Sequence, residues 1–110
     1  MAVQLPEHCT LCPRRCGADR RTGNGRCGAG NTLRAARAAL HRWEEPCISG
    51  EDPARGSGTV FFCGCTLGCV FCQNGSISHG GEGREITARR LAEIFLELQA
   101  QGAYNINLVT

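Results

Sequence analysis

Lysine is absent from this sequence, aromatic residues make up only 5% of it, and no apolar run approaches the roughly 20 residues that a membrane-spanning helix requires. The first residues, MAVQLPEHC, contain neither a basic n-region nor an apolar core, so they predict no secretory signal peptide. These absences argue against a membrane protein and against a secreted one. We therefore expect a cytoplasmic protein.

The twelve basic residues are all arginines, and they are unevenly placed. Residues 1–42 hold eight of them against Glu7 and Asp19, whereas residues 43–110 hold four against eight acids. A basic segment can indicate a nucleic-acid partner or an anionic substrate. Residues 1–42 contain no aromatic side chain on which a base could stack, however, so we favour a metal-binding module with a charged surface over a nucleic-acid-binding one.

Nine cysteines in 110 residues are the outlying number of the composition. In a short secreted chain they would indicate a disulfide framework. Here the count is odd, no export signal is predicted, and several cysteines stand only two or three residues apart, which suits a shared metal or cluster better than a disulfide. We therefore interpret the chain as a reduced, metal-loaded protein.

The first half of the chain predicts little regular structure. Residues 1–30 are rich in cysteine and glycine and indicate loops. Residues 31–42, NTLRAARAALHR, are compatible with a short helix or a strand, and their alanine content favours helix. Residues 44–58 contain two prolines and several glycines, and they predict a loop or linker.

Regular patterns begin in the second half. The β-branched and aromatic run Thr59–Phe62 predicts a short buried strand. Thr87 can cap a helix that runs to about Gln101, with Gly102 as a natural stop. One apolar stripe at helical spacing supports this helix and consists of Leu91, Ile94, Phe95 and Leu98.

A second strand is predicted at residues 104–110, where Ile106 and Leu108 alternate with asparagines. Strand, loop, helix and strand form a βαβ unit, in which the two strands lie parallel. Two parallel strands alone bury too little surface, so we expect an α/β fold that is the truncated start of a larger barrel or sheet. We divide the chain into a Cys-rich metal-binding segment with its linker, residues 1–56, and the start of the barrel, residues 57–110.

Three cysteines between the first predicted strand and the helix are spaced C-x3-C-x2-C: Cys65, Cys69 and Cys72. Thiolates are the standard ligands of iron–sulfur clusters, and three of them leave one iron of a cubane open to a small molecule. Gly64 and Gly68 allow the backbone to wrap closely around such a cluster. In α/β barrels the loops after the strands carry the chemistry. The motif therefore predicts an iron–sulfur site.

This spacing, with Phe71 directly before the last cysteine, resembles the signature of the radical S-adenosylmethionine (radical SAM) superfamily. The strings GSGTVFFCGCTLGCVFCQN, GAYNINLVT and CTLCPRRCGADR resemble the uncharacterised relatives of the pyruvate formate-lyase activating enzyme more closely. The resemblance covers nearly all of the chain. It implies that the predicted βαβ unit is the first of a partial (β/α) radical SAM barrel and that the chain is an N-terminal fragment.

The resemblance also implies a chemistry. Cys65, Cys69 and Cys72 would each ligate one iron of a 4Fe–4S cluster, and S-adenosylmethionine would bind the fourth iron beside Phe71, which lies near the adenine in such proteins. The products would include a 5′-deoxyadenosyl radical that abstracts a hydrogen atom, as in glycyl-radical enzyme activation. The electron donor would be a protein such as flavodoxin or ferredoxin, and the substrate can be a protein. The sequence does not identify that substrate.

Two alternatives belong to different classes of function. Cys63 supplies a fourth nearby thiolate, so Cys63, Cys65, Cys69 and Cys72 could enclose a structural zinc ion in a non-catalytic module. A simple electron carrier would need four thiolates per cluster and would not respond to S-adenosylmethionine. We favour the radical SAM interpretation over both.

Four further cysteines lie near the N-terminus in the pattern Cys9-x2-Cys12-x3-Cys16-x10-Cys27. Four thiolates suit a closed zinc site and a second iron–sulfur cluster equally well, and some of these cysteines could instead be buried thiols. Cys47 stands alone, and we expect it to be a packed thiol.

Residues 80–82 spell Gly-Gly-Glu, a string that many radical SAM enzymes use to hold the methionine amine. In those enzymes it follows the second strand, whereas here it precedes the predicted helix. We therefore assign residues 80–83 to a flexible loop and give them no role in binding.

Overall fold

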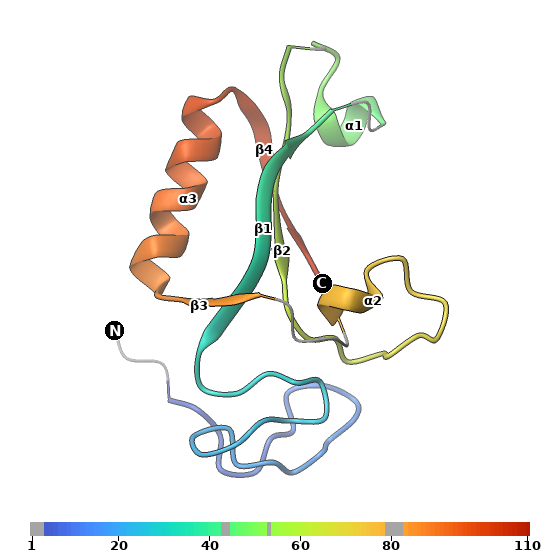
Figure 1. Cartoon of the computed structure of the whole chain (residues 1–110), viewed down its shortest axis with the longest axis vertical. Helices are drawn as coiled ribbons and strands as arrows, with labels where there is room; N and C mark the ends of the chain where they lie inside the picture. The colour runs from blue at the N-terminus through green and yellow to red at the C-terminus, as the bar shows by residue number, and fades with distance from the viewer. Residues whose placement is uncertain (1–3, 43–44, 53, 79–82) are drawn as a thin grey trace.

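The computed structural model describes residues 4–42, 45–52, 54–78 and 83–110, and its central feature is one four-stranded β-sheet (Figure 1). The strands lie in the order β3-β1-β2-β4. None of the helices in these residues is long and apolar enough to span a membrane. The chain is a small mixed α/β domain whose elements are β1 Leu33–His41, α1 Pro46–Ser49, β2 Gly56–Phe62, α2 Gly75–Ser78, β3 Arg84–Ile86, α3 Ala88–Ala100 and β4 Ala103–Val109.

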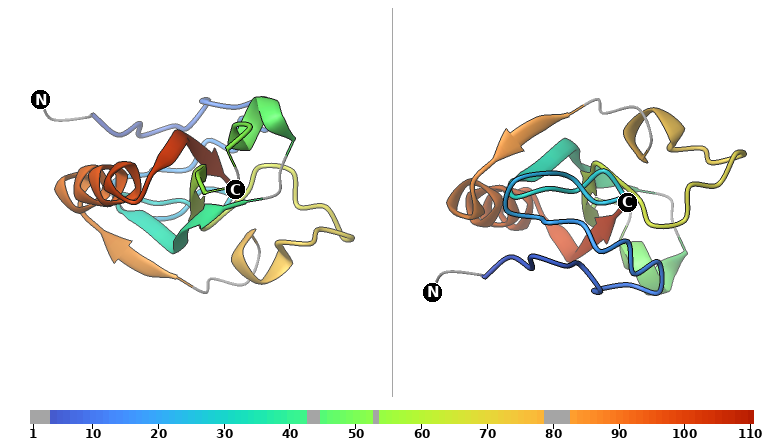
Figure 2. Two further views of the ribbon diagram at one scale, coloured as in Figure 1. Left: turned by 90° about the horizontal axis from the view of Figure 1, so that it is seen from above. Right: turned by 90° about the horizontal axis from the view of Figure 1, so that it is seen from below.

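The predicted strand–helix–strand unit is present as β2, α3 and β4. β2 and β4 pair in parallel, with Val60 opposite Leu108, which confirms the predicted direction. β2 begins at Gly56, earlier than the predicted Thr59. Figure 2 shows α3 to one side of the sheet, where it packs against β4, β1 and β2.

Residues 33–41 form strand β1, so the preference for helix in residues 31–42 is wrong. β1 is antiparallel to β2, with Ala38 opposite Val60, and also to β3, with Arg34 opposite Glu85. Intrinsic helix preferences differ by less than about 1 kcal/mol among ordinary residues. Backbone pairing with a strand on each side outweighs that small preference, because strand formation depends on neighbouring strands more than on composition.

The predicted linker, residues 44–58, contains regular structure in its described part: the short helix α1 and the first residues of β2. Asn105 of β4 connects the two elements. Its Nδ2 donates to the Ile48 carbonyl at 2.6 Å, and its Oδ1 accepts from the Ser57 hydroxyl at 2.6 Å. The segment is therefore a packed connection, which corrects the linker prediction.

Helix α3 confirms the predicted cap and stop. The Thr87 hydroxyl accepts a hydrogen bond from the Arg90 backbone N–H at 3.1 Å, as an N-cap residue should. The helix ends at Ala100, and Gly102 follows with a φ of +100°, a conformation that favours glycine. The apolar stripe faces the sheet and packs on a small core formed by Val60, Leu98 and Ala103.

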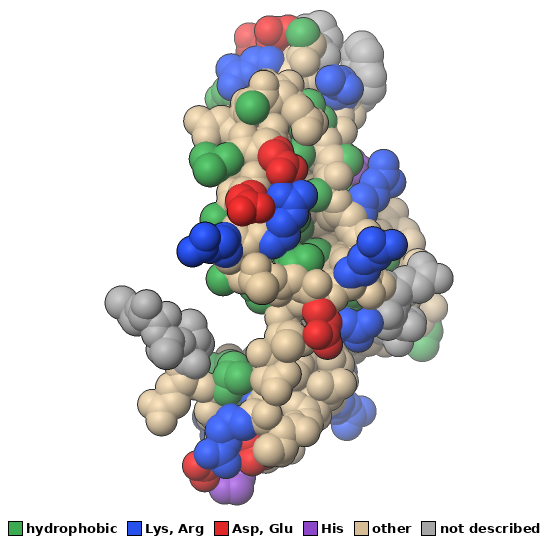
Figure 3. Space-filling model, turned by 60° about the vertical axis from the view of Figure 1, so that its left-hand side comes forward, with side chains coloured by type: hydrophobic (Ala, Val, Ile, Leu, Met, Phe, Trp, Pro, Cys, Tyr) green, Lys and Arg blue, Asp and Glu red, His purple; other side chains and the backbone are tan. Residues whose placement is uncertain are grey.

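The outer face of α3 is charged. Arg90 forms ion pairs with two glutamates further along the helix. Its Nη1 lies 3.2 Å from Oε2 of Glu93, one turn away, and 2.7 Å from Oε1 of Glu97, two turns away. Figure 3 shows basic and acidic side chains intermixed on this side of the molecule, with apolar side chains between them. Exposed pairs of this kind contribute little to stability, so burial of the inner stripe holds the helix in place.

Candidate functional site

The predicted cluster loop, residues 63–74, follows β2 directly and contains no helix or strand. Figure 1 places it at the same end of the sheet as residues 4–32, which we call the N-terminal module. Gly64 and Gly68 have φ angles of +90° and +71°, which side-chain-bearing residues rarely adopt. The Cys72 N–H donates to the Cys69 carbonyl at 3.3 Å, so the loop turns back on itself between its last two cysteines.

Cys65, Cys69 and Cys72 are all partly buried. The backbone N–H groups of Leu67 and Gly68 hydrogen bond to Cys65, and they hold the pKa of its thiol below the usual value. The loop therefore favours a thiolate at Cys65, and the thiolate is the form that binds metals.

Two other side chains contact this set of cysteines. The hydroxyl of Thr110, directly after β4, is a hydrogen-bond partner of Cys65. The Cys72 sulfur lies 3.9 Å from the Ser78 hydroxyl in α2. The residue after the second parallel strand and the last residue of the short helix thus contact the first and the last cysteine of the motif. Neither contact was foreseen, because nothing in the local sequence around Thr110 or Ser78 marks it.

The middle of the cluster loop faces solvent. Phe71, which the family resemblance places near the adenine of a bound cofactor, is 87% exposed. Val70 and Leu67 beside it are also exposed. The described residues therefore leave one side of this loop uncovered.

The N-terminal module carries the four other clustered cysteines on loops. Cys9 is buried, and its backbone forms two hydrogen bonds of 3.0 Å, one to the Ala18 carbonyl and one from the Gly17 N–H. These bonds bring Cys9 beside Cys16, which is also its side-chain hydrogen-bond partner. The sulfurs of Cys16 and Cys27 both lie next to Gly25, each 3.5 Å from the point that a Cβ there would occupy.

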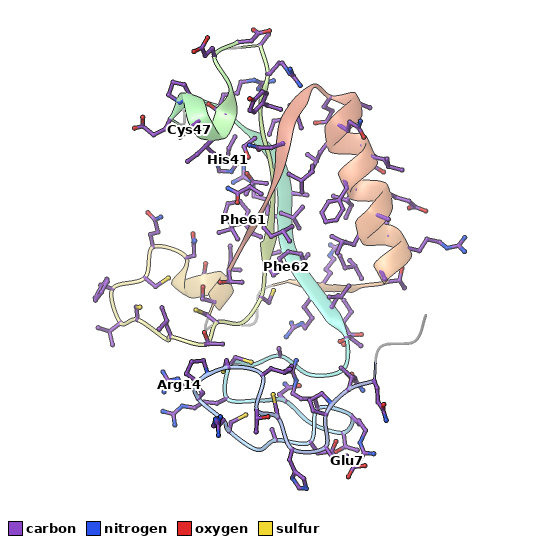
Figure 4. All side chains as sticks on the ribbon, turned by 180° about the vertical axis from the view of Figure 1, so that it is seen from behind. Glu7, Arg14, His41, Cys47, Phe61 and Phe62 are labelled. Atoms are coloured by element: carbon purple, nitrogen blue, oxygen red, sulfur yellow. The ribbon has the colours of Figure 1, made fainter. Side chains whose placement is uncertain are left out.

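The module and the cluster loop are joined by direct contacts. The Cys65 N–H donates to the Cys27 carbonyl at 3.0 Å, and a Cβ on Gly64 would approach that same oxygen to 2.6 Å. Arg14 donates from Nε to the Thr66 carbonyl and from Nη2 to the Leu67 carbonyl, both at 2.7 Å. Figure 4 shows Arg14 on the side of the module that faces the loop. This role of Arg14 was not predicted, because nothing in the local sequence distinguishes Arg14 from its neighbour Arg15.

A cavity of about 310 Å³ lies between the module and the loop. Its lining includes Arg14, Arg26, Cys27, Cys65 and Gly68. Two arginines and one cysteine from each set therefore line the same cavity.

The thiols do not form a closed coordination shell as they stand. Within the described residues, no three His, Cys, Asp or Glu side chains lie close enough together to hold a metal ion. The donor chemistry nevertheless fits a thiolate-bound group, since all nine cysteines are described and none forms a disulfide. Residues 80–82, the Gly-Gly-Glu string, lie outside the described residues.

Cys47 and Cys63 lie apart from these sets. Cys47 is exposed on α1, so its prediction as a packed thiol is wrong. Figure 4 shows it at the opposite end of the sheet from the cluster loop. The Cys63 sulfur lies against Gly83, where an added Cβ would overlap it. Cys63 is therefore fitted closely against the residue that precedes β3.

No family model and no solved structure matches the chain. The chain is 36% identical over 78 residues to MJ0674, an uncharacterized protein of Methanocaldococcus jannaschii. The match covers 71% of this chain and 21% of the archaeal protein, so the chain spans about a fifth of that relative's length.

Replacement of Arg14 tests whether the module fixes the cluster loop. We expect Arg14→Met to speed amide hydrogen exchange across residues 64–68 roughly fivefold, because it removes two hydrogen bonds with a net value of about 1 kcal/mol. Mass spectrometry of peptides from this segment gives the measurement. Arg15→Met removes the same charge from the neighbouring position and serves as the control. Equal exchange in both variants would show that Arg14 does not hold the loop.

Proposed function

We propose that the chain is the front part of a radical SAM enzyme, in which Cys65, Cys69 and Cys72 bind a 4Fe–4S cluster. The observation that carries the proposal is the position of the motif: a C-x3-C-x2-C loop follows β2 directly, and β2 is the first strand of a parallel β2-α3-β4 unit. The ends of parallel strands are where α/β folds place their reactive groups. In this proposal β2, α3 and β4 begin a partial (β/α) barrel, to which β1 and β3 add antiparallel strands.

The residues of the loop have separable roles in this proposal. Backbone N–H groups stabilise the Cys65 thiolate, which prepares the first ligand. Arg14 fixes the backbone of the two residues that follow. Arg14 and Arg26 in the adjoining cavity offset the negative charge of the bound thiolates. When bound, such a cluster and S-adenosylmethionine supply the 5′-deoxyadenosyl radical for hydrogen abstraction.

The exposed side of the loop suggests how the rest of an enzyme would contribute. Phe71 is available to contact a bound nucleoside, because its side chain is exposed next to the last ligand. The 78 matched residues are 21% of the archaeal relative, which is therefore more than three times as long as this chain. We infer that further parts of such a longer protein cover Leu67, Val70 and Phe71 and exclude water from the radical. Glycyl-radical activation or a related hydrogen abstraction is the reaction class, with flavodoxin or ferredoxin as donor and a protein as a candidate substrate.

The position of Cys63 favours three ligands over a closed zinc site. A zinc site would have to gather Cys63 with Cys65, Cys69 and Cys72 around one ion. The Cys63 sulfur is instead packed against Gly83, next to β3. To bind zinc, the Cys63 sulfur would have to move away from Gly83 and would leave a gap beside the sheet. A three-thiolate cluster does not require Cys63 to move.

Anaerobic reconstitution with iron and sulfide tests the proposal. We expect about four irons and four sulfides to be bound through Cys65, Cys69 and Cys72. Adding S-adenosylmethionine should change the electron paramagnetic resonance spectrum of the reduced cluster, because an open iron accepts a ligand. A cluster whose spectrum does not respond would indicate an electron carrier. Zinc without sulfide at these three cysteines would indicate a structural module, and either result would overturn the proposal.

A further inference from the structure

We propose that Cys9, Cys12, Cys16 and Cys27 bind one zinc ion, and that the zinc-bound N-terminal module holds the cluster loop in position. The zinc site is independent of the proposed function. Only its effect on the bound cluster rests on that function.

The N-terminal module lacks the usual means of staying folded. All of residues 4–32 are described, and they contain no helix and no strand. Cys9 is the one buried residue among them, at 6% exposure. A segment this small with no hydrophobic core ordinarily needs a metal or disulfides, and these cysteines form no disulfide. A metal ion bound by the four cysteines is the remaining means of keeping the module folded.

The backbone already brings the first three cysteines into one turn system. The Cys9 N–H donates to the Ala18 carbonyl, and the Cys9 carbonyl accepts from the Gly17 N–H. Cys9 therefore pairs with the two residues that directly follow Cys16. The Arg15 N–H donates to the Cys12 carbonyl at 3.1 Å, which closes a turn between Cys12 and Cys16. Gly17 has a φ of +70°, so the chain reverses immediately after the third cysteine. A short hydrogen-bonded loop that turns at its cysteines is the arrangement in which structural zinc sites occur.

A second turn presents the fourth cysteine to the same place. The Gly28 N–H donates to the Gly25 carbonyl at 2.9 Å, and the Gly25 N–H donates to the Ala29 carbonyl at 2.8 Å. Cys27 lies within this turn, and its sulfur and that of Cys16 lie 3.5 Å from the same point, the position of a Cβ on Gly25. Gly28, like Gly17, directly follows its cysteine and has a positive φ, of +86°. The two turns therefore share one feature, a glycine of positive φ directly after a cysteine, and they bring Cys16 and Cys27 to the same residue.

The electrostatics of the module favour thiolates. The backbone N–H groups of Ala18 and Arg26 hydrogen bond to Cys16. The Arg20 guanidinium lies 3.6 Å from the Cys9 sulfur. Four thiolates around Zn²⁺ leave a net negative charge, which nearby cations and N–H donors stabilise. The surrounding chain supplies the stabilising positive charge, since residues 1–42 hold eight arginines against two acids.

The pairing of Cys9 with Cys16 favours zinc over a second cluster. With Zn–S bonds of about 2.3 Å in a tetrahedron, ligand sulfurs stand about 3.8 Å apart. The ligands of a cubane bind different irons and stand further apart. Cys9 and Cys16 are side-chain hydrogen-bond partners, so their sulfurs lie close together, as two ligands of one ion do. A single ion therefore requires less rearrangement than a cluster.

Two residues of the module, Cys27 and Arg14, would connect the proposed zinc ion to the cluster loop. The carbonyl of one ligand, Cys27, accepts the N–H of Cys65. Arg14, between the ligands Cys12 and Cys16, donates to the carbonyls of Thr66 and Leu67. Fixing the module would fix both contacts, so zinc would position the loop without touching anything bound to it.

The zinc content of a variant that lacks the cluster ligands tests the site separately from the proposed function. We expect the triple variant Cys65→Ala, Cys69→Ala, Cys72→Ala to contain about one zinc ion per chain by elemental analysis. Cys12→Ser should lose it, and Cys47→Ser, a change at an exposed lone cysteine, should retain it. Cys16→His should keep the metal, because histidine is also a zinc ligand, and it guards against simple misfolding. Substitution with Co²⁺ should give the absorption of tetrahedral thiolate coordination, altered in Cys16→His.

Two results would overturn the site. The triple variant could bind no zinc, or it could bind iron with sulfide at the N-terminal cysteines, which would make them a second cluster. The positioning role has its own readout. Removal of zinc by a chelator should speed hydrogen exchange at residues 64–68 several-fold in the triple variant, and unchanged exchange would refute the coupling. Failure of the cluster to form in the unmutated chain would count against the proposed function alone.

Discussion

We expect Cys69→Ala to abolish the iron–sulfur cluster while leaving the N-terminal metal in place. Cys69 is the middle ligand of the proposed set, and its loss leaves two thiolates for a cubane that needs at least three protein ligands here. The module that carries the other cysteines is hydrogen bonded to the loop at residues 65–67. The N-terminal site should therefore keep its fold. Iron, sulfide and zinc analysis after anaerobic reconstitution gives both results from one sample.

The expected change is from about four irons and four sulfides per chain to none, with zinc unchanged at about one. Cys47→Ala is the matched control, because it removes an exposed thiol at the other end of the sheet (Figure 4). Retention of iron and sulfide in Cys69→Ala would show that the ligand assignment is wrong. Simultaneous loss of zinc would show that the two cysteine sets form one site, contrary to both proposals.

We expect Leu98→Ala to be the most destabilising single change in α3. Leu98 is 2% exposed and packs on Val60 and Ala103 in the small core. Truncation of a buried leucine removes apolar contacts and leaves a cavity, which typically costs about 3 kcal/mol. Because domains of this size have a total stability of roughly 5–15 kcal/mol, the change should strongly shift unfolding. Urea denaturation followed by circular dichroism measures the free energy of unfolding.

The same helix provides the control for this prediction. Leu96 is 64% exposed, so Leu96→Ala removes the same atoms from the solvent side and should change stability by less than about 0.5 kcal/mol. Similar losses in the two variants would mean that the stripe of α3 is not packed on β2 and β4 as described. That result would also weaken the proposed barrel start, which depends on this packing.

The two proposals give the cysteines of this chain different tasks. Cys65, Cys69 and Cys72 would bind a reactive group on a partly open loop, whereas the N-terminal four would close around a structural ion. The structure connects the two tasks through the Cys27 carbonyl and the Arg14 side chain. In these proposals the metal would stabilise an N-terminal module that has no hydrophobic core, and the module would in turn fix the geometry of the cluster loop.

The sequence alone determined the parts of this protein whose signals are local. The cap at Thr87, the apolar spacing of the stripe and the stop at Gly102 all act within a few residues, so they predicted α3 correctly. Thr59–Phe62 and residues 104–110 likewise predicted the two parallel strands. The loop of residues 63–74 followed from closely spaced cysteines and glycines, whose chemistry and backbone freedom are properties of the residues themselves.

Tertiary structure alone decided the rest. The alanines of β1 carry no strong local preference, and pairing with β2 and β3 made them a strand. The same holds for the contact of Cys65 with Cys27, the reach of Arg14 to the cluster loop and the exposure of Cys47. The two contacts join residues that are dozens of positions apart, and whether they form depends on how the N-terminal module packs against the end of the sheet. No pattern within a short stretch of sequence encodes that outcome, because the partner that makes each interaction favourable lies elsewhere in the chain.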